Sequence, residues 1–209
     1  MKSIYQQYLR KLGIRDTYSQ ACQDLFVLDM LSNKQKGFYF EVGASHPFES
    51  SNTFLLQNDF HWNGYSIEID ERLAVDFNNV RNNTCLVYDA TTLDYKQLFQ
   101  SKGFPKQIDY LSLDIEPASN TLKALEALPL DDYRFSVITY EHEFYMSGPE
   151  CMEKSRAILK SKGYELVVEN VISAGRDFED WYVDPTVIQK SIWEKYRNKK
   201  VNFKEVFNI

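Results

Sequence analysis

Short apolar runs alternate with helix-like segments along most of the chain. Seven runs have the length and residue types of β-strands, and they lie at 38–42, 65–69, 85–88, 110–115, 135–140, 164–169 and 181–183. Between the first six runs, apolar residues recur at helical spacing at about 51–57, 71–80, 93–101, 118–127 and 149–162. This alternation predicts βαβ units that build a mostly parallel α/β sheet with helices on both faces. No long helix separates the last two runs, which favours an antiparallel hairpin at one edge of the sheet.

The residues before the first strand predict a helical extension. The pair Thr17 and Gln20 fits a capping box, and apolar residues follow at helical spacing until Gly37. We therefore expect the first 31 residues to be helical. At the other end of the chain, Pro185 is expected to begin a C-terminal helix.

Length and spacing together favour one domain. A chain of 209 residues is long enough to bury about 70% of its unfolded surface. The expected division of residues 1–209 is a helical extension at 1–36, an α/β core at 37–183, and a helix and tail at 184–209.

Composition and charge exclude several classes of protein. No apolar run approaches the roughly 18–20 residues of a membrane span, and the first residues lack the apolar stretch of a signal peptide. The three cysteines are widely spaced, which is typical of a reducing compartment, so we expect a cytoplasmic protein. The formal net charge of −6 disfavours binding to nucleic acid, whose phosphates are also negative.

Ligands of open α/β sheets bind beyond the carboxyl ends of the strands, so these ends hold the candidate site residues. The first strand ends in Glu41-Val42-Gly43-Ala44-Ser45, where two small residues would let the backbone approach a ligand closely. A plain turn between a strand and a helix would look the same. The second strand ends in Glu68, whose carboxylate could accept hydrogen bonds from ribose hydroxyls, and Asp70 is expected to cap the next helix.

Carboxylates also end the next strands. Asp89 and Ala90 end the third strand and could hold an adenine ring, although Asp89 could equally cap a turn near Thr91. Asp114 and Glu116 end the fourth strand, where two acids cost desolvation and mutual repulsion, so a functional role is expected for at least one.

The fifth strand ends in Glu141 and His142. A histidine among carboxylates suits proton transfer near neutral pH, so His142 is a candidate general base. Asp114, Glu116 and His142 could also bind a divalent metal, but their spacing matches no metal motif and no metal site is predicted.

At these strand ends the sequence resembles the FkbM-family S-adenosylmethionine-dependent methyltransferases. The resemblance covers roughly residues 17–145 and rests on segments that keep their order and spacing. They are Ser19–Asp24, Phe40–Ala44, Ser51–Thr53, Trp62–Glu68, Asp109–Glu116 and the pair Glu141-His142.

The resemblance implies a Rossmann-like class I methyltransferase fold and methyl transfer, usually to a hydroxyl oxygen. The cofactor would be S-adenosylmethionine, with its methionine part near Asp114 and near the first-strand residues Glu41, Gly43, Ala44 and Ser45. Glu68 would bind the ribose, and Asp89 with Ala90 would lie near the adenine.

The expected acceptor is a hydroxyl on a sugar or on another small polar molecule. His142 would be the base, and Glu116 or Glu141 would orient His142 or bind the substrate. The alternative is a non-catalytic module that binds an adenosyl ligand, because Ser45-His46-Pro47 departs from the family's usual loop. A nicotinamide oxidoreductase is disfavoured, since the first strand is not followed by a GxGxxG fingerprint.

Overall fold

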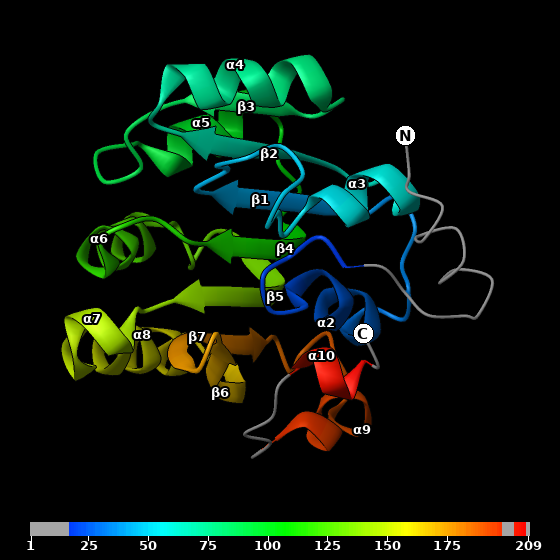
Figure 1. Ribbon diagram of the computed structural model, residues 1–209, viewed down its shortest axis with the longest axis vertical. Coiled ribbons are helices and arrows are strands. Elements are labelled where there is room, and N and C mark those ends of the chain that lie inside the picture. Colours follow the sequence, from blue (N-terminus) through cyan, green and yellow to red (C-terminus); the bar gives the residue numbers. More distant parts are fainter. Residues whose placement is uncertain (1–16, 198–202, 208–209) are drawn as a thin grey trace.

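The centre of the molecule is a seven-stranded sheet in the order β3-β2-β1-β4-β5-β7-β6 (Figure 1). The structure is a computed structural model that describes residues 17–197 and 203–207. Its strands are β1 (Phe38–Val42), β2 (Asn63–Glu68), β3 (Thr84–Val87), β4 (Gln107–Leu113), β5 (Arg134–Glu141), β6 (Glu165–Ser173) and β7 (Arg176–Val183). β1 to β5 pair in parallel, and β7 lies antiparallel between β5 and β6. The predicted parallel sheet with an antiparallel C-terminal hairpin is confirmed.

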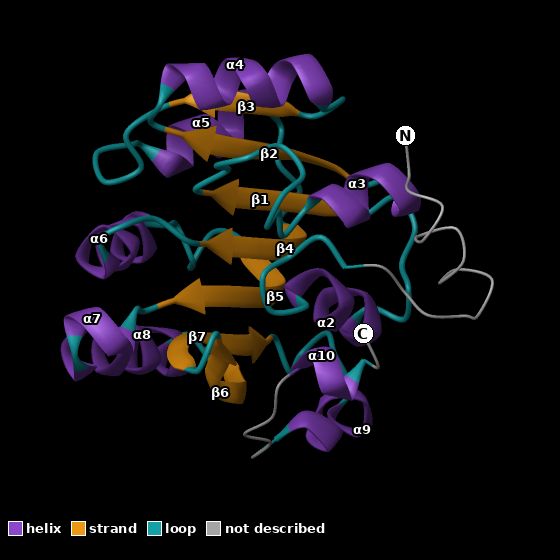
Figure 2. Cartoon of the chain, viewed as in Figure 1, coloured by secondary structure: helices purple, strands orange, loops and turns teal. Residues whose placement is uncertain are grey.

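Helices cover both faces of this sheet (Figure 2). One face packs against α2 (Gln23–Met30) and α3 (Phe54–Phe60). The opposite face packs against α5 (Tyr95–Ser101), α6 (Ala118–Ala127) and α8 (Pro149–Ser161), and α4 (Glu71–Val80) packs beside β3. The shorter elements are α7 (Phe144–Ser147), α9 (Lys190–Trp193), the 3-10 turn η1 (Glu194–Tyr196) and α10 (Phe203–Val206).

The two cores follow from the alternation of side chains along each strand. In β1, Tyr39 faces the α2 side and Phe40 faces the α5 side, and both are fully buried. Burying both faces explains why the central strands show continuous apolar runs in the sequence.

The C-terminal hairpin is longer than predicted. The apolar pattern predicts strands at 164–169 and 181–183, but β6 continues to Ser173 and β7 begins at Arg176. The pairing of β6 with β7 shifts register between Val168 and Val171, and Asn170 between them has a φ of 54°. These irregularities break the alternation by which a strand is recognised.

The predicted helix over the first 31 residues is confirmed for Gln23–Met30 and wrong for residues 17–22, while residues 1–16 lie outside the described residues. The Asp24 carboxylate accepts hydrogen bonds from Thr17 Oγ1 (2.6 Å), Ser19 Oγ (2.7 Å) and the N–H of Tyr18 (2.9 Å). These bonds hold a loop over residues 17–22, and α2 begins only at Gln23. The loop also forms a β-bridge from Ser19 to Ser50.

The prediction that a helix begins at Pro185 is also wrong. Asp184 Oδ1 accepts hydrogen bonds from the N–H of Thr186 (3.0 Å) and from its hydroxyl (2.6 Å), which fixes a turn around the proline. The next helix, α9, begins at Lys190.

Within residues 17–197 and 203–207, none of the helices is both long and apolar enough to cross a membrane.

Candidate active site

A cleft lies beyond the carboxyl ends of β1, β2, β3 and β4, and it consists of two adjoining cavities. The larger has a volume of about 390 Å³ and the smaller about 80 Å³. Both are lined by Gly43, Glu68, Ile69, Ile115 and Glu116. The cleft is therefore at the edge of the sheet where the sequence predicts a ligand.

The turn after β1 forms the floor of the larger cavity, to which Glu41, Gly43, Ala44 and Ser45 contribute. Gly43 has a φ of +93°, and a Cβ atom on it would lie 1.7 Å from the carbonyl oxygen of Asp114. The sequence suggests that a small residue here admits a ligand. The structure gives a second reason, because the closest neighbour of Gly43 is the backbone of the chain itself.

Glu68 lies at the junction of the two cavities. One carboxylate oxygen accepts the N–H of Ser45 (3.0 Å), and the other accepts the N–H groups of Ile69 (2.9 Å) and Asp70 (3.0 Å). These bonds fix the carboxylate between the turns after β1 and β2. Asp70 caps α4 by accepting the N–H of Arg72 (2.8 Å), as predicted.

Asp89 and Ala90 line the smaller cavity. Asp89 accepts hydrogen bonds from the N–H (2.8 Å) and the hydroxyl (2.7 Å) of Thr91, and these bonds lower its pKa. The turn-capping alternative for Asp89 is therefore present in the structure, and it coexists with a place at the cavity wall.

Glu41 is buried under the larger cavity. Its carboxylate accepts hydrogen bonds from Ser66 Oγ (2.6 Å) and from Thr53 Oγ1 (3.0 Å). Burial raises the pKa of Glu41 to about 7, against the charge of nearby Arg81 and these hydrogen bonds, which lower it. Glu41 can therefore gain or lose a proton near neutral pH.

Three carboxyl groups meet at the ends of β4, β5 and β7. Asp114 lines the larger cavity, and buried Glu141 is hydrogen-bonded to it. Glu179 lies opposite Glu141 in the β5–β7 pair and accepts hydrogen bonds from Gln23 Nε2 (2.9 Å) and Trp181 Nε1 (2.7 Å). Burial, together with the hydrogen bond and charge of Asp114, raises the pKa of Glu141 well above its usual range. At neutral pH, Glu141 therefore holds a proton.

Glu179 makes the stability of the protein depend on pH. Burial raises its pKa from 4.5 to about 8, so the folded state binds a proton that the unfolded state has lost. The stabilisation is complete below the unfolded pKa and is lost as pH rises through about 8. We expect Glu179→Gln to melt a few degrees above the wild type at pH 9 but not at pH 5. Thermal unfolding at both pH values measures this, and an equal difference at the two would contradict it.

Glu116 lines both cavities and is exposed. It follows the end of β4, so Asp114 and Glu116 share the cleft wall, as the sequence predicts. Among the residues that the structure describes, no group of three or more His, Cys, Asp or Glu side chains is arranged to hold a metal ion.

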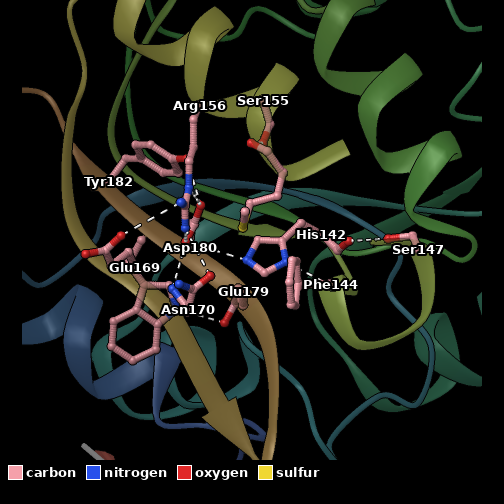
Figure 3. A network of polar contacts seen from close by, with 12 residues as sticks. His142, Phe144, Ser147, Ser155, Arg156, Glu169, Asn170, Glu179, Asp180 and Tyr182 are labelled. Atoms are coloured by element: carbon pink, nitrogen blue, oxygen red, sulfur yellow. Dashed lines mark hydrogen bonds and ion pairs between the residues drawn. The ribbon is translucent and has the colours of Figure 1, made fainter. Parts of the chain in front are cut away.

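His142 does not line either cavity. Its side chain is fully buried, with Nδ1 accepting the N–H of Phe144 (3.2 Å) and Nε2 lying 3.5 Å from Asp180 Oδ1 (Figure 3). Burial would raise the pKa of Asp180, but hydrogen bonds from Arg156 and the nearby imidazole of His142 lower it to about 2. The expectation that His142 removes a proton from an acceptor is not supported by this position, because the ring faces an internal ion pair. Adjacent residues of a strand face opposite sides of the sheet, and in β5 it is Glu141 that faces Asp114.

Two residues in or beside the cleft, Glu179 and Asn52, were not predicted from the sequence. Glu179 was hidden because the irregular pairing of β6 with β7 obscures the start of β7. Asn52 lies in the recognised segment Ser51-Asn52-Thr53 and lines the larger cavity, but it was assigned no role. The sequence did contain a signal for this residue, because Asn52 is an amide side chain between a serine and a threonine just before α3. Gln20 also lines this cavity, and its Nε2 donates to Ser173 Oγ at the tip of the β6–β7 hairpin (3.2 Å).

Solved structures resemble this chain, whereas no protein-family model and no curated protein matches it. A candidate O-methyltransferase from Klebsiella pneumoniae has a TM-score of 0.54 and 15% identity, over 85% of this chain and 86% of that one. An rRNA methylase from Streptococcus thermophilus has a TM-score of 0.50 and 12% identity, over 77% of this chain and 93% of the other. A candidate rRNA methylase from Clostridium thermocellum has the same TM-score and identity, over 81% and 97%.

These similarities establish the fold. Its seven strands, mostly parallel with an antiparallel C-terminal pair, form the Rossmann-like sheet of the methyltransferase structures. The relatives differ in the substrates that their names give, so the substrate of this chain has to be argued from its own residues.

Proposed function

We propose that this protein is an S-adenosylmethionine-dependent methyltransferase of the FkbM type, acting on a hydroxyl oxygen of a sugar or another small polar acceptor. One observation carries the proposal. The eight residues expected to bind the cofactor come from four separate strand ends, and all of them line the same cleft. They are Glu41, Gly43, Ala44, Ser45, Glu68, Asp89, Ala90 and Asp114.

The order of these residues along the cleft fits an adenosyl group followed by an amino acid. The smaller cavity, with Asp89 and Ala90, would take the adenine. Glu68 at the junction offers carboxylate oxygens to a ribose diol, the partner that such oxygens bind best. The larger cavity would take the methionine part beside Gly43 and Asp114.

When bound, the cofactor supplies an activated methyl group, whose carbon forms a bond to the acceptor oxygen while its bond to sulfur breaks and leaves a thioether. The protein has to align the hydroxyl and accept its proton. Asp114 is the carboxylate in position for this, and buried Glu141 behind it is hydrogen-bonded to it. Exposed Glu116, at the mouth of both cavities, is placed to orient the acceptor.

The charge of the protein supports a small-molecule acceptor rather than a nucleic acid. The net charge is −6, and none of the described residues that line the two cavities is Lys, Arg or His. A phosphate backbone would find no partner there and would be repelled.

Isothermal titration calorimetry with S-adenosylmethionine tests the proposal. We expect the wild type to bind and Glu68→Gln to bind about 10- to 100-fold more weakly, because a charge-assisted hydrogen bond contributes about 1.5–3 kcal/mol. Glu71→Gln is the matched control, because the Glu71 side chain is exposed on α4 and lies outside both cavities. This variant should bind as the wild type does. Absence of binding by the wild type would refute the proposal.

A radiolabelled methyl-transfer assay over a panel of hydroxyl acceptors separates enzyme from binding module. Labelled product is expected with at least one sugar or polyol. Tight cofactor binding without any labelled product would instead support the non-catalytic adenosyl-binding module.

A further inference from the structure

Arg81 is a buried positive charge next to the wall of the larger cavity. The residue directly follows α4, is 5% exposed and lines neither cavity of the cleft. Its guanidinium packs on the rings of Phe54 and Phe77, with Cζ 5.3 Å and 4.5 Å from the two ring centroids. Taking a charge out of water is costly, so the surroundings of Arg81 have to compensate it.

All three nitrogens of Arg81 donate hydrogen bonds. Within the described part of the chain every acceptor is a neutral oxygen, and none is a carboxylate. Three of the acceptors lie in segment 47–53, of which residues 49–52 line the larger cavity. Arg81 therefore holds this part of the cavity wall from behind. The acceptors are Gln57 Oε1, the carbonyl oxygen of Pro47 (2.9 Å), Ser51 Oγ (3.4 Å), Thr53 Oγ1 (3.1 Å) and the hydroxyl of Tyr39 (3.2 Å).

Thr53 connects Arg81 to Glu41. Its hydroxyl accepts the hydrogen bond from Arg81 and donates one to Oε2 of Glu41 (3.0 Å). A hydroxyl can make both bonds at once, because it has one donor and two acceptor positions. A hydrogen bond to a carboxylate is stronger when the carboxylate is ionised. Glu41 is therefore placed to be the anion that compensates the buried cation, with Thr53 between the two.

Among the described residues, the charged groups that act most strongly on Glu41 are Arg81 and Asp114, and they oppose each other. The charge of Arg81 favours the ionised carboxylate, whereas burial and the charge of Asp114 favour the protonated one. The other titratable groups that act on Glu41 are neutral near pH 7, since burial raises the pKa of each above its usual range. They are Tyr39, Cys85 and Tyr110.

We propose that Arg81 is a positioning residue of the cofactor site, which acts from outside the cleft. Through Thr53 it keeps Glu41 ionised, so that the wall of the larger cavity attracts the positively charged S-adenosylmethionine at neutral pH. This inference rests on the proposed methyltransferase function and adds to it a residue that contacts neither the cofactor nor the acceptor.

Carbon-13 NMR of the glutamate carboxyl groups in the ligand-free protein tests the link between the two side chains. Glu41→Gln identifies the Glu41 signal by its disappearance. The signal should titrate near pH 7 in the wild type and at least about one pH unit higher in Arg81→Met. Arg81→Lys, which keeps the positive charge, should stay nearer to the wild type than Arg81→Met. Titration at the same pH in Arg81→Met and the wild type would overturn the inference.

Calorimetry with S-adenosylmethionine at two pH values separates this role from a purely structural one. We expect Arg81→Met to bind about tenfold more weakly than the wild type at pH 7. At pH 9 the loss should be less than about threefold, because Glu41 is then largely ionised in both proteins. An equal loss at the two pH values would show that Arg81 only supports the fold of the wall.

Two further variants complete the comparison. Arg72→Met removes an exposed positive charge from α4 outside both cavities, and it should bind as the wild type does at both pH values. Thr53→Val keeps the size of the side chain and leaves the guanidinium in place. It should also bind more weakly at pH 7 than at pH 9, relative to the wild type. If Arg81→Met does not fold, Thr53→Val decides the question.

The outcomes separate the two proposals. If the wild type does not bind S-adenosylmethionine at either pH, the methyltransferase assignment fails, while the NMR titration still decides whether Arg81 controls the charge of Glu41. If the wild type binds and Arg81→Met binds equally well at pH 7, only the inference about Arg81 fails.

Discussion

Replacing Gly43 by alanine is expected to destabilise the protein by at least about 3 kcal/mol and to abolish binding of S-adenosylmethionine. The new Cβ would lie 1.7 Å from the carbonyl oxygen of Asp114 and 2.8 Å from its carbonyl carbon. Both are backbone atoms, so no side chain can rotate away, and β1 has to separate from the end of β4. The φ of +93° adds strain for any residue with a side chain. Urea unfolding and calorimetry measure the two effects.

Gly163→Ala is the matched control. Gly163 also has a positive φ, of +79°, but a Cβ on it would meet nothing within 4 Å. It should lose only the roughly 1–2 kcal/mol of left-handed strain and keep the affinity for the cofactor. If Gly43→Ala proved as stable as Gly163→Ala, the close approach of the two strand ends would be wrong.

Replacing Asp114 by asparagine should lower kcat by about 100- to 10,000-fold, the range associated with loss of a general base. Asparagine keeps the size of the side chain and a hydrogen bond to Glu141, but it cannot take up a proton. The affinity for S-adenosylmethionine should fall much less than kcat, because Glu68 and the smaller cavity are unchanged. Steady-state kinetics with the best acceptor, together with calorimetry, separates the two quantities.

Asp76→Asn, on the exposed side of α4, is the control for a lost surface charge. A kcat for Asp114→Asn within tenfold of the wild type would show that another group, or water, accepts the proton.

The central strands β1, β4 and β5 were predictable because each buries both faces and therefore consists largely of apolar residues. The same topology explains why the residues at the strand ends were correctly predicted to lie together. Once the strands are parallel, Gly43, Glu68 and Asp114 have to meet at one edge, whatever the helices between them do. No contact between distant side chains has to be guessed for this part of the site.

The residues whose placement was predicted wrongly or missed depend on contacts that are distant in sequence and that no local pattern contains. At the end of β5 either Glu141 or His142 can point toward Asp114, and the pleat, which depends on the register with β4 and β7, selects Glu141. Neither residue lines the two cavities of the cleft. In the N-terminal segment, a helical pattern was overridden by the Asp24 carboxylate, which bonds three preceding residues into a loop. Glu179 was missed because Asn170 and the shifted register conceal the length of the hairpin.

The loop before α2 links parts of the molecule that are far apart in sequence. Ser19 bridges to Ser50 in the wall after β1, and Gln20 bonds to Ser173 at the hairpin tip. A shortened chain that began at β1 would keep every strand of the sheet, yet it would leave one side of the ligand chamber open to water. Domain boundaries for expression should therefore be drawn upstream of this loop, even though the sheet topology alone suggests that it is dispensable.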